Sequence, residues 1–414
     1  MSAAALFLAA SLTAQYPTSF TPDIAQRPDV QRATTWIDAN FKAQVDEWVR
    51  LAEVPAPSGK EQRRAAYIKA ELEKLNYKPT SDSSGNVWVR RNGTGGGPTL
   101  VFAAHMDTVF PENTNVKVTR TPDGKLLGAG IADDTASVVN LLNAIRAIEH
   151  AKLQTKADLI FLFTVQEEVG LKGMYAWLEN NRKDMDLLVA LDGDLGAVRY
   201  GALGIYWSKM KFTGPGAHTN RSKGAPNPVR AAAQCITDIY TVPLPGDHER
   251  LGTVYNIGGM MSSGNIVNAV PQEVTFTVDL RTVDKSVMGA LDDALLSKCD
   301  QAARAHGVTF AREWIQKSEP GGTPEDLVDR RRHHIVQTAI DILKHLGVKL
   351  LPGEEAIPNG STDANVGVVN GIPSVAVGRA YGGGQHTSSE WSLADSARIG
   401  TKQIILLAAS LTQK

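Results

Sequence analysis

The stretch TLVFAAHMD at residues 99–107 passes from a continuously apolar run directly into a histidine and an aspartate. Such a run is typical of a strand buried on both faces, as in the parallel sheet of an α/β protein. It therefore predicts that His105 stands at the carboxyl end of a central strand, where α/β sheets gather their functional residues. Metal-binding side chains recur at similar places along the chain, at Asp133, Glu167, Glu168, Asp192 and His386.

Around this stretch, apolar strands alternate with segments that have helical spacing. Strands are expected at residues 158–164, 187–191 and 373–377, and helices at 30–75, 137–151, 173–180 and 324–346. The first helical region is interrupted at residues 54–59, where we expect Ser58 to cap the helix that runs to Leu75. This alternation predicts an α/β fold with a mixed, largely parallel sheet sandwiched by helices.

The pattern changes at residue 204 and returns to the α/β style at residue 319. In between, strands and two helices follow each other in the order β-α-β-β-α-β, which is typical of a ferredoxin-like α+β domain. We therefore expect four regions. They are a tail at residues 1–29, the first part of a catalytic domain at 30–203, an inserted domain at 204–318 and the second catalytic part at 319–414.

The composition is that of an ordinary globular protein, with 43% apolar and 21% charged residues among 414. A formal net charge of -1 gives no global field that would indicate nucleic acid or an anionic membrane as a partner. Cys235 and Cys299 lie far apart and lack CxxC spacing. We therefore expect two reduced or partly buried thiols, with one disulfide as the alternative in an exported protein.

The N-terminal segment leaves the compartment open. Residues 3–12 are apolar and small residues follow them, as at a signal-peptide cleavage site, but no Lys or Arg precedes the run. The run is also shorter than the about 20 residues that a helix needs to cross a bilayer. A signal peptide and a plain tail are equal alternatives, and with them an exported or a cytoplasmic protein.

The histidines and carboxylates at the predicted strand ends form the ligand set of a paired-metal hydrolase. Asp107 lies two residues after His105, so that both side chains share one face if the strand persists, and Asp107 can accept the second imidazole N–H. Two Zn²⁺ ions carry +4, three carboxylates carry -3, and a bridging hydroxide brings the centre to neutrality. Glu167, next to a ligand, is then left free to transfer protons. A solvated acidic pair is the alternative for Glu167 and Glu168 alone.

Five short motifs resemble the two-metal (di-zinc) exopeptidase family that contains peptidase T, carboxypeptidase G, bacterial dipeptidases and aminoacylase. They are HMDTV at 105–109, ADD at 132–134, EEVG at 167–170, Asp192 and His386. The resemblance covers the chain from about residue 30 to its end and is closest to tripeptide aminopeptidases of the peptidase T type.

The resemblance implies a division of roles among these residues. Asp133 would bridge two metal ions, with His105 and Asp192 on one ion and Glu168 and His386 on the other. Glu167 would be the general base, Asp107 would orient His105, and the peptide bond between Asp133 and Asp134 would be cis. The ions would be zinc, with cobalt or manganese as alternatives.

The resemblance also assigns roles in the inserted domain and near the C-terminus. The domain would be a lid that mediates a homodimer, and His218 would reach the site of the neighbouring subunit and stabilise an oxyanion. Asn268 and Arg281 would bind substrate, and Gly360 and Ser361 would contact the substrate backbone. An exposed loop histidine is the alternative for His218, and a surface ion pair is the alternative for Arg281.

Together these observations predict a metal-dependent exopeptidase that hydrolyses short peptides through a metal-bridging hydroxide, in the manner of a tripeptide or dipeptide aminopeptidase. An N-acyl amino acid deacylase or a carboxypeptidase with the same centre is the alternative, and a non-catalytic binding protein of the same fold is a more remote one.

Two features depart from the family pattern. Thr135 stands where Lys or Gly is common in the family. Residues 166–171 also resemble glutamyl aminopeptidases, which carry a different inserted domain.

Overall fold

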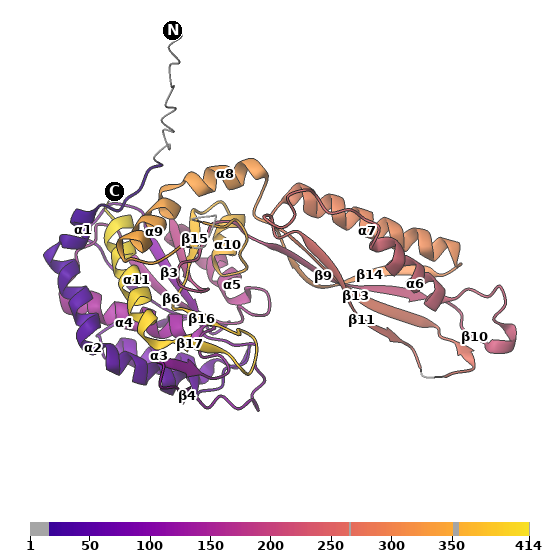
Figure 1. Ribbon diagram of the computed structural model, residues 1–414, viewed down its shortest axis with the longest axis horizontal. Helices are drawn as coiled ribbons and strands as arrows, with labels where there is room; N and C mark the ends of the chain where they lie inside the picture. Colours follow the sequence, from indigo (N-terminus) through magenta and orange to yellow (C-terminus); the bar gives the residue numbers. More distant parts are fainter. Residues whose placement is uncertain (1–15, 265, 351–355, 414) are drawn as a thin grey trace, which may run out of the picture.

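A seven-stranded mixed sheet forms the centre of the computed structural model, which describes residues 16–264, 266–350 and 356–413 (Figure 1). Its order is β1-β2-β6-β3-β7-β15-β8. The four central strands run parallel and are buried along their whole length: β6 (Leu159–Thr164), β3 (Leu100–His105), β7 (Leu187–Leu191) and β15 (Ser374–Val377). The edges are antiparallel: β1 (Thr80–Ser81), β2 (Val87–Arg91) and β8 (Val198–Arg199). The predicted mixed, largely parallel sheet is confirmed.

Helices cover both faces of this sheet because successive side chains of each buried strand point to opposite sides. From β3, Phe102 packs into the larger core, whereas Val101 and Ala103 pack into a second core on the other face. The larger core is covered by α2 (Pro28–Ala52), α4 (Thr135–Ala151), α9 (His334–His345) and α11 (Ala397–Leu411), with α1 (Pro22–Gln26) and α3 (Gln62–Glu73) beside them. The second core lies under α5 (Lys172–Asn181) and α10 (Ala364–Val369).

Residues 204–318 form an arm that extends away from the rest of the molecule (Figure 1). Its antiparallel sheet has the order β11-β13-β9-β14. The strands are β9 (Gly204–Thr213), β11 (Val254–Ser262), β13 (Glu273–Thr282) and β14 (Thr309–Ser318), and the helices are α6 (Pro228–Ile239) and α7 (Lys285–Ala305). These elements enclose a separate hydrophobic core, and at the tip β10 (Ala217–His218) pairs with β12 (Ala269–Val270).

Cys235 on α6 and Cys299 on α7 are joined by a disulfide across the core of the arm. The expectation of two reduced thiols is therefore wrong. Both side chains are fully buried, and the two helices pack against each other so that the Cα atoms lie 4.7 Å apart. Their sequence separation of 64 residues gave no indication of this contact.

A second, smaller sheet completes the α/β part. The sheet has the order β16-β17-β5-β4, formed by β16 (Gly382–Gly383), β17 (Trp391–Leu393), β5 (Lys125–Leu127) and β4 (Thr119–Arg120). It fixes the loop that carries His386 beside the segment that leads into α4.

The expected helix at 324–346 is two helices, because His333 adopts an extended backbone between α8 (Pro324–Arg332) and α9 and caps α9 through its Nδ1.

Two further expectations concern the N-terminal region. Ser58 does not cap a helix: α3 begins at Gln62, and the Ser58 hydroxyl instead donates to Asp107 Oδ2 at 2.7 Å. The apolar segment at residues 3–12 lies outside the described residues. Among the helices that the structure describes, none combines the length and apolarity needed to cross a membrane.

Candidate metal centre

The carboxyl ends of three neighbouring central strands meet at one edge of the sheet. His105 ends β3, Glu167 and Glu168 follow β6, and Asp192 follows β7. Asp133 and Asp134 stand directly before α4, and His386 lies in the loop between β16 and β17. Possible ligand atoms lie within 4.8 Å of one another in three overlapping groups: His105, Asp133, Asp134 and Asp192; His105, Glu167 and Glu168; and Asp133, Glu168 and His386.

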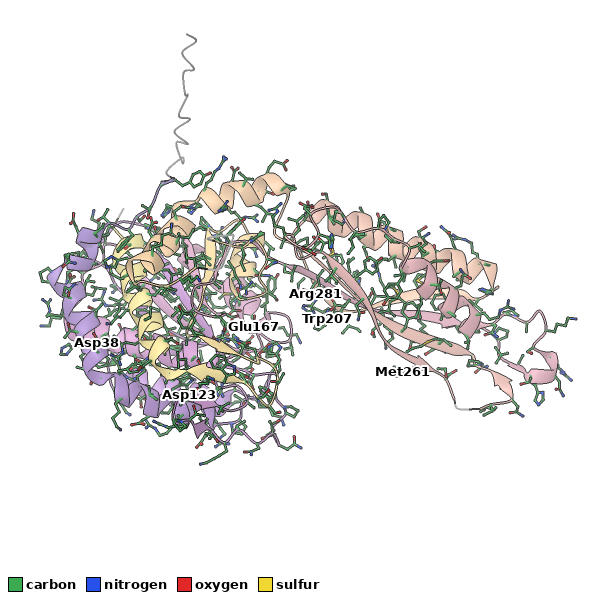
Figure 2. All side chains as sticks on the ribbon, in the orientation of Figure 1. Asp38, Asp123, Glu167, Trp207, Met261 and Arg281 are labelled. Carbon is green, nitrogen blue, oxygen red and sulfur yellow. A yellow bond between two sulfur atoms is a disulfide. The ribbon has the colours of Figure 1, made fainter. Side chains whose placement is uncertain are left out.

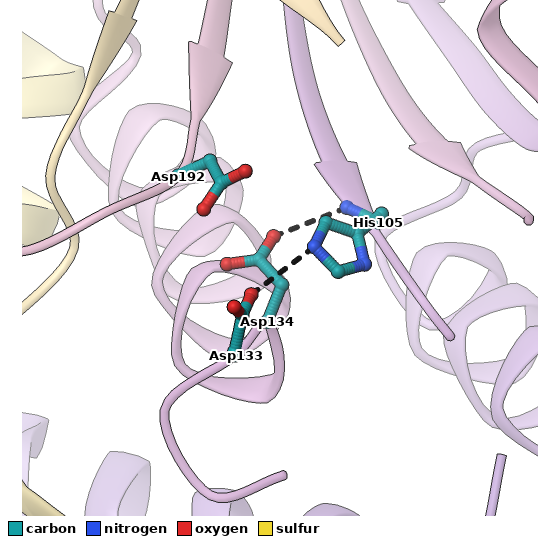
Figure 3. Close-up of side chains that lie close together, drawn as sticks. All are labelled: His105, Asp133, Asp134 and Asp192. Carbon is teal, nitrogen blue, oxygen red and sulfur yellow. Dashed lines mark hydrogen bonds and ion pairs between the residues drawn. The ribbon is translucent and has the colours of Figure 1, made fainter. Parts of the chain in front are cut away.

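Asp133 lies between two sets of ligands, with one carboxylate oxygen toward each. Its Oδ1 is 3.3 Å from His105 Nε2, and its Oδ2 is 3.4 Å from His386 Nε2. Glu168 Oε2 is 3.3 Å from the same His386 nitrogen. Figure 3 shows the first set, in which Asp133, Asp134 and Asp192 lie on the same side of His105. With one oxygen toward each of the two histidines, Asp133 has the geometry that a bridging carboxylate needs.

The hydrogen bonding of these groups tests whether they fit metal ions. Asp133 Oδ1 and Glu168 Oε1 are buried, and neither accepts a hydrogen bond from any described residue. A buried acceptor that stays unpaired costs about 1–3 kcal/mol, and more when it is charged. Imidazole nitrogen and carboxylate oxygen are common ligands of Zn²⁺, so divalent cations would satisfy the unpaired oxygens. The donor set fits two ions, as the sequence predicts.

Asp107 supports His105 from beneath the centre. Its Oδ1 is 3.3 Å from His105 Nδ1, which also lies 3.1 Å from the Asp107 carbonyl oxygen, and this leaves Nε2 to face Asp133. The carboxylate accepts hydrogen bonds from Ser58 Oγ and from the backbone amides of Glu167 and Glu168. Burial acts to raise the pKa of Asp107, but His105 and these donors outweigh it and lower the pKa. The Asp107 carboxylate thus contacts the imidazole nitrogen that points away from Asp133.

Glu167 is buried, with 7% of its surface exposed, and its Oε2 lies 3.9 Å from His105 Nε2. Burial raises its pKa well above the ordinary value. His105 opposes this rise, whereas the charges of Asp192 and Glu168 add to it. A carboxyl group whose pKa is raised in this way holds a proton more readily than an ordinary glutamate.

Two charged residues that the sequence analysis did not single out hold the centre together. Glu390 accepts hydrogen bonds from the backbone amides of Gly130, Ala132 and Asp133, and so fixes the segment before α4. The peptide bond between Asp133 and Asp134 in this segment is cis. Arg379 lies two residues after β15, within ion-pair distance of three of the aspartates. The rule that found His105 could have found it, since Arg379 also follows an apolar strand.

A cavity of about 560 Å³ lies between the α/β part and the base of the arm. Figure 2 labels Glu167 on one side and Trp207 and Arg281 on the other. Gly360 and Ser361 line the same cavity. The Arg281 side chain is held by Asp279, with Nη2 2.9 Å from Oδ2, and its Cζ lies 5.7 Å from the Trp207 ring centroid.

Arg199 also lines the cavity, and the sequence analysis does not single it out. Arg199 lies on β8, and its Nη1 donates to the Asn359 carbonyl at 3.0 Å. No described carboxylate lies within ion-pair distance of it. The sequence carried little signal, because Arg199 sits on a two-residue edge strand with no long apolar run before it.

His218 and Asn268 do not line this cavity. Both lie at the far tip of the arm, where the Asn268 side-chain amide is 3.4 Å from His218 Nε2 (Figure 1). His218 is exposed and instead borders a separate surface hollow formed by the tip. Within one chain, therefore, the structure brings together the predicted metal ligands, Glu167, Asp107, Arg281, Gly360 and Ser361, but not His218 or Asn268.

Comparison with known proteins matches residues 101–409 to peptidase family M20/M25/M40. Carboxypeptidase G2 from a Pseudomonas species is 24% identical over 78% of this chain and 77% of its own length. A succinyl-diaminopimelate desuccinylase from Methylibium petroleiphilum is 25% identical over 57% and 64%. The crystal structure of a tripeptidase from Staphylococcus aureus superposes with a TM-score of 0.76 at 22% identity, over 91% of this chain and 99% of that chain.

Proposed function

Because the chain belongs to peptidase family M20/M25/M40 and is a hydrolase of peptide or amide bonds, we propose that it is a two-metal exopeptidase of short peptides. Within that class, the expected activity is that of a tripeptide or dipeptide aminopeptidase. The metal ions are expected to be zinc, with cobalt or manganese as alternatives.

One observation carries this proposal: Asp133 directs its two oxygens toward two different histidines. A single ion would need only one of these sets. The proposal therefore assigns Asp133 as the bridge, His105 and Asp192 as ligands of one ion, and Glu168 and His386 as ligands of the other. The unpaired oxygens of Asp133 and Glu168 support this assignment.

The residues around the centre have separate tasks in the proposed reaction. When bound, the two ions would supply polarisation of the scissile carbonyl and would lower the pKa of a nearby water molecule. Glu167 accepts a proton from that water on its carboxylate and passes it to the leaving amine. Asp107 keeps the His105 imidazole in the orientation that ligation requires.

The cavity supports a small substrate that carries a carboxylate. Arg281 on the arm and Arg199 on the sheet edge both line it, and a guanidinium group can bind a carboxylate with two parallel hydrogen bonds. Gly360 and Ser361 on the same wall are positioned to contact the substrate backbone. Because the arm bounds the cavity on one side, the site suits the end of a short chain better than the middle of a long one.

His218 and Asn268 fit this proposal only if a second copy of the chain is present, because they lie at the tip of the arm. We propose a homodimer in which the arm of one subunit delivers its His218 to the site of the other. The outer strand β11 of the arm exposes Met260 and Met261, and the turn that follows exposes Ile266 and Val267. Apolar surface of this kind often marks an interface.

The test is a cleavage panel with the metal-loaded protein. Tripeptides, dipeptides and N-acetyl amino acids are incubated separately, and the products are identified by mass. We expect release of the N-terminal residue from tripeptides. Release of the C-terminal residue would favour a carboxypeptidase, and cleavage of acyl compounds alone would favour a deacylase. An inert protein that binds two metal ions would leave only the non-catalytic alternative.

A further inference from the structure

Arg379 places a positive charge inside the acidic cluster of the metal centre. Its side chain is only 2% exposed. Nη1 lies 2.6 Å from Asp192 Oδ1 and 3.1 Å from Asp134 Oδ1, and Nη2 lies 3.4 Å from Asp133 Oδ1. A guanidinium group stays protonated in proteins, so this charge is permanent. The cluster therefore contains a fixed cation before any metal ion binds.

Both polar groups of the Arg379 backbone form hydrogen bonds. The Arg379 amide donates to the Gly193 carbonyl at 3.1 Å, and its own carbonyl accepts from Asn140 Nδ2 at 2.9 Å. Gly193 directly follows Asp192, so the contact ties the arginine to the segment that carries a proposed ligand. Arg379 is thus placed by the fold and does not depend on its carboxylate partners alone.

The charge of Arg379 acts unequally on the two proposed ion positions. Its partners Asp192 and Asp133 Oδ1 face His105, whereas none of its ion pairs among the described residues reaches Glu168. A cation bound by His105 and Asp192 would lie next to the guanidinium and be repelled by it. The ion bound by Glu168 and His386 would lie on the far side of Asp133.

We propose that Arg379 is a charge-balancing positioning residue. It holds the aspartates together when no metal is bound, and it weakens the ion on the His105 and Asp192 side relative to the other ion. Asp134 completes the balance: it pairs with Arg379 and accepts a hydrogen bond from the His105 amide, and it is not one of the proposed ligands. The inference rests on the two-metal proposal.

The first test compares Arg379→Gln with the wild type in two measurements, the unfolding temperature without and with zinc, and the stepwise binding of zinc by titration. In Arg379→Gln the metal-free unfolding temperature should fall, because three carboxylates lose their common partner, and zinc should restore most of the loss. The weaker of the two ions should bind at least about tenfold more tightly. Weaker binding of that ion would overturn the proposal, since the alignment of Asp192 would then outweigh the repulsion.

Arg146→Gln is the matched control, because Arg146 is a partly buried arginine that pairs with Glu47 and Glu71 away from the metal centre. It should lower both unfolding temperatures equally and leave zinc binding unchanged. Wild-type protein that binds no zinc would overturn the proposed function itself. Two ions in the wild type with unaltered affinities in Arg379→Gln would overturn only the role of Arg379.

A second variant covers the case in which Arg379→Gln fails to fold. Asp134→Asn with Arg379→Gln removes one negative and one positive charge together, and the asparagine oxygen can still accept the His105 amide hydrogen bond. If charge balance is the role of Arg379, this double variant should fold without metal. Where Arg379→Gln does fold, the double variant should have a metal-free unfolding temperature closer to that of the wild type than Arg379→Gln has. A double variant that also fails to fold without metal would show that Arg379 acts through packing and would overturn the proposal.

Discussion

Two buried acidic clusters in the α/β part satisfy their charges in opposite ways. Glu47 on α2, which is 4% exposed, accepts hydrogen bonds on both oxygens, from Tyr67, Asn143 and twice from Arg146, at 2.6–2.9 Å. In the metal centre, Asp133 Oδ1 and Glu168 Oε1 receive no hydrogen bond from the described residues. Burial of an acidic group alone therefore does not mark a functional site.

The difference shows what each cluster does. The Glu47 cluster is complete within the protein and joins α2, α3 and α4, so its task is structural. The metal centre contains buried carboxylate oxygens that accept no hydrogen bond, which is energetically costly unless another group binds there. Buried oxygens without hydrogen bonds, gathered among possible metal ligands, distinguish this centre from the Glu47 ion pair. Four experiments test this distinction.

The largest expected effect is on catalysis, in Glu167→Gln. The amide keeps the shape of the side chain but cannot transfer the proton, so kcat should fall by about 10²–10⁴-fold. Metal content, measured by elemental analysis, should stay the same because Glu167 is not a proposed ligand. Glu47→Gln is the control: it should destabilise the fold but keep kcat at temperatures where the protein is folded. Loss of metal from Glu167→Gln would assign this residue as a ligand instead.

The next effect is on stability, in Arg146→Gln. Removing one partner of a buried ion pair leaves the other charge uncompensated and typically costs about 3–5 kcal/mol. Because the Arg146 side chain is 18% exposed, we expect about 3 kcal/mol in the free energy of unfolding by urea. Arg90→Gln is the surface control, since Arg90 forms exposed pairs with Asp158 and Asp184, and it should cost less than about 1 kcal/mol. Equal losses would remove the distinction between a complete buried cluster and surface pairs.

The sequence predicts those features of the fold and the site that depend on residues near each other along the chain. His105, Glu167 and Asp192 were found because each follows a buried strand within a few residues, and the strand order then brings them together. Ser58 was assigned to the wrong partner because its contact with Asp107 spans 49 residues and replaces a local cap.

Two charge pairings lie beyond the same limit. The pairing of Glu47 with Arg146 spans 99 residues and that of Asp192 with Arg379 spans 187, so no periodicity or spacing could indicate either. The break at His333 has a different cause, because helical apolar spacing continues on both sides of it. Local patterns predict which strand ends carry chemistry, whereas the partners of charged groups follow from the tertiary fold alone.

Removal of metal should destabilise the wild type to a slightly smaller extent. A ligand that binds only the folded state at 100 times its Kd adds about 2.7 kcal/mol, so a chelator should lower the unfolding temperature of the loaded protein. Asp133→Asn loses the bridging charge and should respond much less. The same chelator should leave the contribution of the Glu47 cluster unchanged, measured as the difference between wild type and Glu47→Gln. A chelator response in Asp133→Asn equal to that of the wild type would contradict the bridge.

The smallest effect is confined to acid pH and concerns Glu47. Burial acts to raise its pKa, but the hydrogen bonds from Arg146, Tyr67 and Asn143 outweigh it and hold the pKa below its ordinary value. Because the folded state has the lower pKa, the stabilisation is complete above the unfolded pKa and is lost as pH falls through the folded value. The difference in unfolding free energy between wild type and Glu47→Gln, measured in chelator, should therefore stay constant above about pH 5 and narrow below it. The metal-centre carboxylates titrate in both proteins and cancel in this difference, so a gap that stays constant down to about pH 3 would show that Glu47 does not hold its charge as the structure indicates.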